Sequence, residues 1–200
     1  RSNDTADYTF ANAGVAADIE AGVASDDGDG ANDVLRNIEN LTGSSFADTL
    51  SGDDNANILT GGSDNDILQG RGGSDTLDGG DGSADVADYS QAELSGIQVN
   101  LALNNTANDG DGGSDSLNDI EHVWGSGFDD RIIGDNVANR LEGRAGNDVL
   151  EGGGGADILD GGAGDEDVAD YSNATGAVVI DLDQGQALND GFGSVDTLID

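Results

Sequence analysis

The sequence predicts an all-β protein: a right-handed parallel β-roll with nonapeptide repeats and essentially no α-helix. Two observations support this prediction. Nine-residue units of the form G-G-x-G-x-D-x-(Leu/Ile/Val)-x follow one another without gaps, and no segment combines a 3.6-residue apolar period with helix caps. Units this short supply one strand and one turn each, so successive units must stack to bury an apolar face. They occupy two runs, Gly43 to Asp78 and Gly125 to Asp160.

A longer period of 82 residues is superimposed on the nine-residue one. Ile38 recurs as Ile120, and Tyr89 recurs as Tyr171. The chain therefore holds a little under two and a half copies of one large unit. We expect a partial unit at 1–42, a first roll run at 43–87, a β insert at 88–124, a second roll run at 125–169, and a partial third β segment at 170–200.

The insert is expected to contain a strand that follows the sequence ADYS. Apolar residues alternate in Gly96–Leu101 and again in Val178–Leu182, which is typical of a half-buried strand. An Asp/Gly-rich loop comes next, at 108–115 in the complete unit. The tyrosines Tyr8, Tyr89 and Tyr171 recur at matching positions, and we expect them to pack where the roll meets this strand.

Within each nonapeptide, position eight is predicted to point inward. A strand of about three residues around it turns one side chain to the core and its neighbours outward. The first six residues then reverse the chain, with glycine tolerating the positive φ that such turns need. Loops two repeats apart should lie directly above one another. The predicted core ladder comprises Leu50, Leu59, Leu68, Leu77, Ile132, Leu141, Leu150 and Leu159.

The composition is extremely acidic. Asp and Glu number 42 against six Lys and Arg, giving a formal net charge of −36, and there are 34 glycines and no cysteine. Nucleic acids and anionic membrane surfaces require basic patches, so neither is an expected partner. No apolar stretch approaches the roughly 18 residues of a membrane span. Charge repulsion and glycine entropy both oppose folding of the bare chain, so a bound cation is expected.

Calcium is the cation that the stacked turns favour. Such turns bring carboxylates and backbone carbonyls together, and Ca²⁺ takes six to eight oxygen ligands in flexible geometry. Magnesium sheds its waters reluctantly, and zinc, copper or iron sites draw on His or Cys. The chain has one His and no Cys. We therefore expect several Ca²⁺ ions.

These repeats resemble the hemolysin-type calcium-binding nonapeptides of the RTX family. The resemblance implies that position six and the carbonyl groups of the glycine turn bind Ca²⁺ between loops. At position six, or in the same slot of looser loops, it indicates Asp33, Asp48, Asn57, Asp66, Asp75, Asp85, Asp115, Asp130, Asn139, Asp148, Asp157, Asp167 and Asp196. In the turns it indicates Gly61, Gly62, Asp64, Gly70, Gly72, Gly73, Gly79, Gly80, Gly82, Gly143, Ala145, Gly146, Gly152, Gly153, Gly154, Gly155, Gly161, Gly162 and Gly164.

Some repeats depart from the family pattern. Asn57 and Asn139 replace the position-six Asp, so we expect weaker or empty sites at those loops. Asp64, Arg71 and Arg144 stand where glycine is usual, and backbone strain is expected there. Occupancy should therefore differ from loop to loop.

The resemblance implies a secreted bacterial module that folds when it meets calcium after type I secretion. The chain begins at Arg1 without Met, which suggests a fragment of a longer protein, monomeric by itself. Two alternatives remain open. One is the C-terminal accessory region of a secreted protease, lipase or polysaccharide-modifying enzyme, and the other is an adhesin that binds glycans or a surface.

Catalysis by this chain is not expected. There is no H-E-x-x-H motif, and a single His leaves little room for a Ser-His-Asp arrangement. His122 and Trp124 replace Asn40 and Thr42 of the other copy. They could form an aromatic sugar platform, but ordinary packing of a variable stretch is the favoured interpretation.

Overall fold

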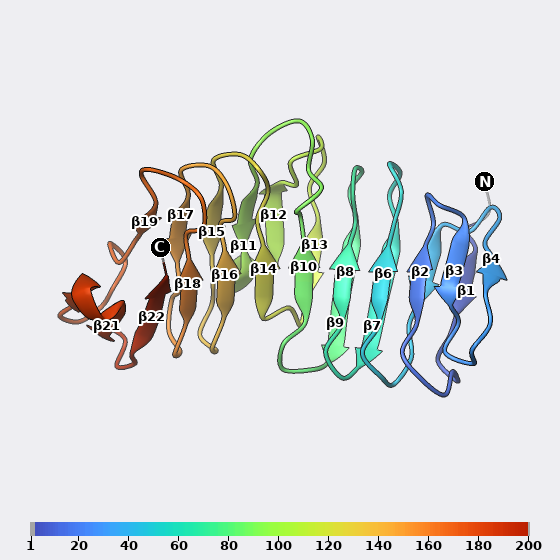
Figure 1. Cartoon of the computed structure of the whole chain (residues 1–200), viewed down its shortest axis with the longest axis horizontal. Coiled ribbons are helices and arrows are strands. Elements are labelled where there is room, and N and C mark those ends of the chain that lie inside the picture. Colours follow the sequence, from blue (N-terminus) through green and yellow to red (C-terminus); the bar gives the residue numbers. More distant parts are fainter. Residues whose placement is uncertain (1–2, 200) are drawn as a thin grey trace.

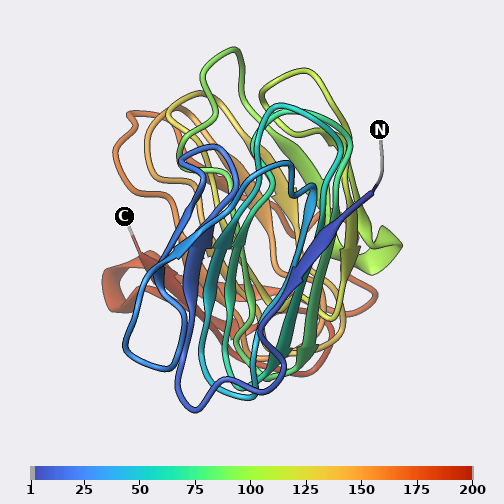
Figure 2. The same cartoon turned by 90° about the vertical axis from the view of Figure 1, so that its right-hand side faces the viewer.

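The computed structural model describes residues 3–199, a solenoid of short strands that stack along one axis (Figure 1). The strands form two facing sheets. One has ten strands in the order β1-β5-β7-β9-β13-β12-β11-β15-β17-β19, and the other has twelve in the order β20-β21-β22-β18-β16-β14-β10-β8-β6-β2-β3-β4. The view along the stack shows the turns lying at its rim (Figure 2). Residues 1, 2 and 200, which belong to the predicted terminal segments, lie outside the described part.

Most strands are three residues long, because positions seven to nine of each repeat form the strand. The first ten are β1 Thr5–Asp7, β2 Ala16–Asp18, β3 Val23–Asp26, β4 Asp33–Val34, β5 Asn40–Thr42, β6 Thr49–Ser51, β7 Ile58–Ser63, β8 Ile67–Gln69, β9 Thr76–Asp81 and β10 Val86–Asp88. The others are β11 Gln98–Asn100, β12 Asn105–Asn108, β13 Ser116–Asn118, β14 His122–Trp124, β15 Arg131–Ile133, β16 Arg140–Glu142, β17 Val149–Glu151, β18 Ile158–Asp160, β19 Val168–Ala169, β20 Val179–Asp181, β21 Gln186–Asn189 and β22 Asp196–Ile199.

The predicted fold class is confirmed. Strands within the roll pair in parallel, as in β5 with β7 and β6 with β8. The helices among residues 3–199 are two single turns of 3-10 helix, η1 Leu101–Leu103 and η2 Leu182–Gln184. None of the helices in this range has the length and apolar character to cross a membrane.

The core is the predicted ladder. All eight position-eight residues are buried, with exposures of 2% or less. The parallel register stacks them directly, for example Leu50 on Leu68 and Ile132 on Leu150. The same cluster continues across the central insert through buried residues such as Val99 and Leu117. The two nonapeptide runs therefore share one core.

Each insert forms three antiparallel strands, which the sequence patterns only partly anticipated. The predicted strands at 96–101 and 178–182 appear as β11 and β20, and each starts a meander with the next two strands. Six roll strands separate successive inserts, and the chain alternates between sheets. The meanders therefore fall in opposite sheets: β2–β4 and β20–β22 in the twelve-stranded sheet, and β11–β13 in the ten-stranded one.

The central insert is built into the roll. Strand β13 pairs in parallel with β9 of the first run, and β11 pairs in parallel with β15 of the second. In the opposite sheet, β10 pairs with both β8 and β14. Both sheets thus run without interruption from one nonapeptide run to the next, which keeps the loops at each edge in a continuous stack.

Candidate calcium sites

The position-six side chain of each repeat folds back over the glycine that opens the repeat. A Cβ at Gly61 would lie 2.2 Å from Asp66 Oδ2, and one at Gly143 would lie 2.3 Å from Asp148 Oδ2. Contacts this short are impossible for a real Cβ. The leading glycine is therefore required by the carboxylate that it accommodates, which explains why the two residues recur together.

One oxygen of each position-six aspartate holds the stack in register. Asp66 Oδ1 accepts the backbone N–H of Asp48 at 2.8 Å, and Asp148 Oδ1 accepts that of Asp130 at 2.7 Å. The same bond joins stacked loops at Asp75, Asp85, Asp157 and Asp167, and it joins an insert loop to a nonapeptide loop at Asp115 and Asp196.

The second oxygen of many of these carboxylates has no donor at all. Each is buried, and a carboxylate oxygen can only accept, so leaving it unpaired costs the full desolvation penalty. Native proteins retain very few such groups without a specific reason. The buried oxygens without a hydrogen-bond partner are Oδ2 of Asp66, Asp75, Asp85, Asp109, Asp148, Asp157, Asp167 and Asp190. A row of unpaired acceptors with the same orientation is what a cation site requires.

These carboxylates also come in neighbouring pairs. Burial raises the pKa of Asp66 to about 7; the N–H of Asp48 opposes this shift, and the negative charges of Asp48 and Asp85 add to it. Burial likewise raises the pKa of Asp148 to about 6, with the charge of Asp167 contributing. Without a metal ion, the Asp66 carboxyl would be partly protonated at neutral pH. A divalent cation would favour its ionised form.

Asp75 and Asp157 have the same character at the equivalent loops. Burial raises the pKa of Asp75 to about 8, against the hydrogen bond from the Asn57 N–H and with the charges of Asp115 and Asp109. Burial raises the pKa of Asp157 to about 7. Both predicted ligands therefore lie in strongly desolvated, negatively charged surroundings.

Asp48 and Asp130, also predicted ligands, have protein donors on both oxygens. The Ser44 N–H donates to Asp48 Oδ2, its hydroxyl donates to Oδ1 at 2.9 Å, and the Val15 N–H also donates to Oδ1. Ser126 makes the same two bonds to Asp130. The geometry does not support metal binding by either side chain, because serine donors fill the positions that a cation would take.

The amides Asn57 and Asn139 are likewise fully engaged. Asn57 Oδ1 accepts the Asp53 N–H, and its Nδ2 donates to Glu39 O at 2.8 Å. Asn139 repeats both contacts in the second run, with Asp135 and Glu121. In both runs the Nδ2 group donates a hydrogen bond to a carbonyl of the adjacent loop. Weaker or empty sites at these two loops stay a prediction.

Asp115, Asp196 and Asp33 belong to the insert loops and receive a tyrosine hydroxyl. Tyr89 Oη donates to Asp115 Oδ2 at 3.0 Å, and Tyr171 Oη donates to Asp196 Oδ2 at 2.8 Å. Their Oδ1 atoms already accept the N–H groups of the preceding loops. Asp33 is exposed and pairs weakly with Tyr8, at 3.4 Å. The tyrosines thus link the insert to the roll, and the geometry leaves these three predicted side chains less suited to metal binding.

The turn residues predicted to offer carbonyls lie along both edges of the roll. Gly62 and Gly80 pair across β7 and β9, and the loops at 70–75, 143–148, 152–157 and 161–167 connect successive strands. Asp64, Arg71 and Arg144 adopt φ of 73°, 65° and 76°. These values lie in the left-handed region that costs non-glycine residues energy, as expected from the sequence.

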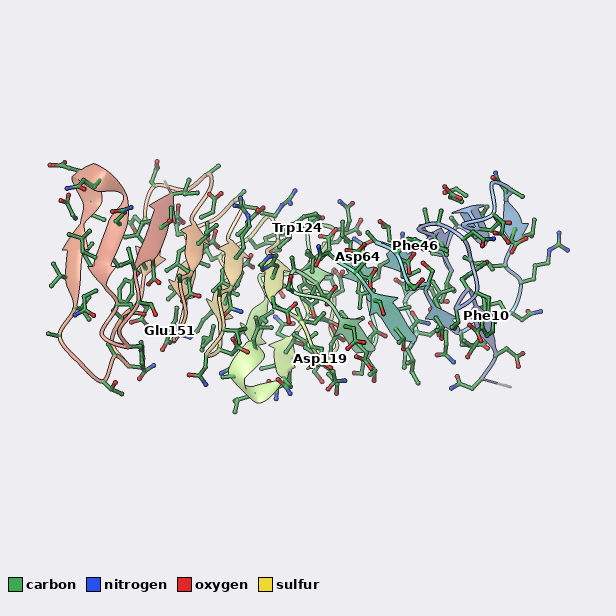
Figure 3. All side chains as sticks on the ribbon, turned by 90° about the horizontal axis from the view of Figure 1, so that it is seen from below. Phe10, Phe46, Asp64, Asp119, Trp124 and Glu151 are labelled. Carbon is green, nitrogen blue, oxygen red and sulfur yellow. The ribbon has the colours of Figure 1, made fainter. Side chains whose placement is uncertain are left out.

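His122 and Trp124 lie on β14 and are both half-buried. Trp124 is labelled in Figure 3. His122 Nδ1 accepts the Arg140 N–H at 3.1 Å, just as Asn40 Oδ1 accepts the Ile58 N–H in the other copy. The replacement therefore preserves a backbone contact. This supports packing rather than a sugar platform.

Side chains alone do not complete a metal site anywhere in residues 3–199, where no three His, Cys, Asp or Glu gather closely enough. Calcium, however, accepts backbone carbonyls as readily as carboxylates. The arrangement seen here, two unpaired carboxylate oxygens beside a glycine-rich turn, suits such a mixed ligand set. Figure 3 shows carboxylate side chains along the whole length of the solenoid.

A comparison of the sequence with known protein families finds one matching repeat. The model of the RTX calcium-binding nonapeptide repeat, which spans four copies, matches residues 37–68, 51–83 and 133–165. These segments are RTX calcium-binding repeats. They include all the position-six residues from Asn57 to Asp75 and from Asn139 to Asp157. No curated protein matched the chain.

Four residues of the RTX loops and inserts escaped sequence reasoning. Asp109 and Asp190 have unpaired buried oxygens. Ser44 and Ser126 donate hydrogen bonds to the carboxylates of Asp48 and Asp130. The first pair carries a signal in the recurring Asp-Gly-x-Gly at 27, 109 and 190. The serines also carry a sequence signal. Each is the second residue of its run and directly follows a Thr-Gly or Trp-Gly pair.

Proposed function

We propose that this chain binds several Ca²⁺ ions in its stacked RTX turns, and that these ions drive the folding of a secreted module. The unpaired, buried Oδ2 atoms of the position-six aspartates are the observation that supports the proposal most directly. Calcium would supply positive charge and coordinate these oxygens together with turn carbonyls. The residues that fit this role in the RTX loops are Asp66, Asp75, Asp85, Asp148, Asp157 and Asp167.

The chain's own groups prepare each site in two ways. The Oδ1 atom is held by an N–H from the neighbouring loop, as at Asp66 and Asp148, so the carboxylate cannot turn away. The leading glycine leaves room for the carboxylate beside the turn. Together these contacts direct Oδ2 into the space between loops before any ion arrives.

The charge balance makes folding depend on such ions. The chain has a formal charge of −36, and the unpaired oxygens lie inside the stack, where repulsion between them is strongest. A site filled at 100 times its Kd stabilises the fold by about 2.7 kcal/mol. Several such sites together match the usual stability of a whole domain, about 5–15 kcal/mol.

The proposed setting is extracellular. RTX repeats are typical of secreted bacterial proteins, and calcium sites of extracellular modules work at about 10⁻⁴–10⁻³ M. An acidic chain that stays unfolded at low calcium and folds at millimolar calcium would suit secretion as an unfolded polypeptide. The module's role in this proposal is structural and assists secretion, without catalysis.

Two aspartates at equivalent positions provide a sharp test. Asp66 and Asp48 are both buried position-six residues, but only Asp66 has an unpaired oxygen. Calcium bound per chain is measured by equilibrium dialysis at about 10⁻³ M calcium. Asp66→Asn is expected to lose one ion, whereas Asp48→Asn is expected to keep the wild-type number. Equal losses from both variants would contradict the assignment, and a wild type that binds no calcium would overturn the proposal.

A further inference from the structure

Asp109 lies in the insert loop between β12 and β13, outside the RTX repeats. Its Oδ1 accepts three backbone N–H groups, from Asp111, Gly112 and Gly113, at 2.8–2.9 Å. These bonds fix the carboxylate within its own loop. Its Oδ2 is buried without any partner, and the whole residue is only 1% exposed. The loop therefore presents one rigid, unpaired oxygen.

The neighbour of that oxygen is the last nonapeptide loop of the first run. The Asp75 N–H donates to Asp115, which closes the insert loop, so the two loops stack. A Cβ at Gly113 would lie 1.2 Å from Gly73 O and 2.5 Å from Asp109 Oδ2. The carbonyl and the carboxylate thus border the same space. Asp75, 2% exposed, contributes a second unpaired Oδ2 on this side.

Asp115 is not the group that completes this space, although it occupies the position-six slot. Both of its oxygens already have donors, Asp75 N–H on Oδ1 and the Tyr89 hydroxyl on Oδ2. Tyr89 is itself buried in the core. The tyrosine therefore holds Asp115 in a structural role, and Asp109 is left as the acidic group that faces Asp75.

The same arrangement recurs at the third insert, β20–β22. Asp190 Oδ1 accepts N–H groups from Phe192, Gly193 and Ser194, while Asp190 Oδ2 is buried and unpaired. The adjacent nonapeptide residue is Asp157, whose Oδ2 is also unpaired. The two loops, DGFGSVD and DGDGGSD, share the pattern D-G-x-G-x-x-D and differ at the three remaining positions.

The first insert supplies an internal control. Asp27 occupies the position of Asp109, and its Oδ1 accepts the Asp29 and Ala31 N–H groups. Its insert ends in β4, the last strand of the twelve-stranded sheet, so no nonapeptide loop stacks on it. Asp27 is accordingly half-exposed. Among these three loops, the second carboxylate oxygen is buried and unpaired at Asp109 and Asp190, the two beside a nonapeptide loop.

We propose that each of the two stacked insert loops completes a calcium site with the nonapeptide loop beside it. Asp109 and Asp75 are ligands of one site, and Asp190 and Asp157 are ligands of the other. These ions bind the inserts to the roll and continue the row of sites where the nonapeptide pattern stops. This inference rests on the proposed calcium function and extends it to residues outside the RTX motif.

The test compares three substitutions of the same kind: Asp109→Asn, Asp190→Asn and Asp27→Asn. Asparagine keeps the Oδ1 acceptor for the loop N–H groups and removes only the anionic oxygen. Calcium per chain is counted by equilibrium dialysis at about 10⁻³ M calcium. We expect one ion fewer for Asp109→Asn, one fewer for Asp190→Asn, two fewer for the double variant, and no change for Asp27→Asn.

A second readout is amide hydrogen exchange of the whole chain with and without calcium. Protection of residues 108–115 is expected to depend on calcium in the wild type and to be lost in Asp109→Asn, while the loops at 143–148 and 161–167 stay protected. If Asp109→Asn does not fold, Asp190→Asn decides, because its insert lies at the end of the twelve-stranded sheet. Wild-type ion numbers in Asp190→Asn, or in a folded Asp109→Asn, would overturn the inference. If Asp66→Asn loses an ion in the same assay, the RTX sites themselves are upheld.

Discussion

At the scale of single residues, the position-six side chain performs two tasks with its two oxygens. Oδ1 joins neighbouring loops through a backbone N–H, and Oδ2 is either left for a cation or taken by a protein donor. Asp66 shows the first arrangement, and Asp48 with Ser44 shows the second. The difference lies in the turn: the backbone N–H of Ser44 donates to Asp48 Oδ2 and its hydroxyl to Oδ1, whereas Asp66 Oδ2 has no donor.

Replacing Ser44 by alanine tests this reading of the serine loops. Ser44→Ala removes the hydroxyl that donates to Asp48 and accepts the Phe46 N–H. It should lower the free energy of unfolding in saturating calcium by about 1–3 kcal/mol, the usual net value of two hydrogen bonds. The number of bound calcium ions should stay the same. Urea denaturation measures the first and dialysis the second. The exposed neighbour Ser45 gives the control Ser45→Ala, and equal effects of the two substitutions would count against the interpretation.

The buried carboxylates also predict a pH dependence in the absence of calcium. Burial raises the pKa of Asp66 and Asp157 to about 7 and that of Asp75 to about 8. An acid whose pKa is higher in the folded chain binds protons on folding, so it favours the fold at low pH, and that contribution disappears as the pH rises through 7 to 8. Calcium-free protein should therefore gain β-structure, followed by circular dichroism, as the pH falls from about 8 to 5. Greater stability at the higher pH would contradict this assignment.

At the scale of elements, each strand contributes one inward residue, and the stability of the roll depends on that single ladder. Leu68 is fully buried, while Leu94 in the insert is 72% exposed. Leu68→Ala should reduce the free energy of unfolding in calcium by about 2–5 kcal/mol. Leu94→Ala should stay within about 0.5 kcal/mol of the wild type. Chemical denaturation in saturating calcium checks both, and similar costs would show that the ladder is not the core.

Sequence patterns predicted these elements to the extent that local periodicity determines them. The nine-residue period identified the ladder, the turns and the acidic loops, because each repeat repeats the same local contacts. The meanders were harder to predict from the sequence. Strand β11 pairs with β15 and β13 pairs with β9, and no short sequence pattern connects these segments. The roles of Asp109 and Ser44 depend on which donors surround an oxygen in the folded chain, and the residue type alone does not reveal this.

At the scale of the whole molecule, the inserts shape the solenoid. The strands β11 and β12 have no counterpart in the opposite sheet, where β14 pairs directly with β16. The ten-stranded sheet is therefore locally longer, by two strand spacings of about 4.8 Å each. The next insert adds its strands to the other sheet. Alternation of this kind balances the two sheets along the stack and keeps the axis extended.

The whole molecule also concentrates a large negative charge around its own core. Within residues 3–199, Arg71, Arg131 and Arg140 form ion pairs, for example Arg71 with Asp18 and Glu20. Six basic residues are far too few to pair with most of the 42 acidic ones. In the proposed function, calcium is therefore a structural component rather than an accessory ligand. Removing it should affect the entire fold at once, because both edges of both runs carry unpaired carboxylates.

A far-UV circular dichroism titration of the whole chain with calcium, at neutral pH and starting from metal-free protein, tests this claim most directly. We expect a disordered spectrum without calcium and a cooperative change to β-structure at about 10⁻⁴–10⁻³ M calcium, reversed by a chelator. An equal concentration of magnesium should leave the chain disordered. A full β-spectrum in excess chelator at neutral pH would show that the fold does not depend on calcium.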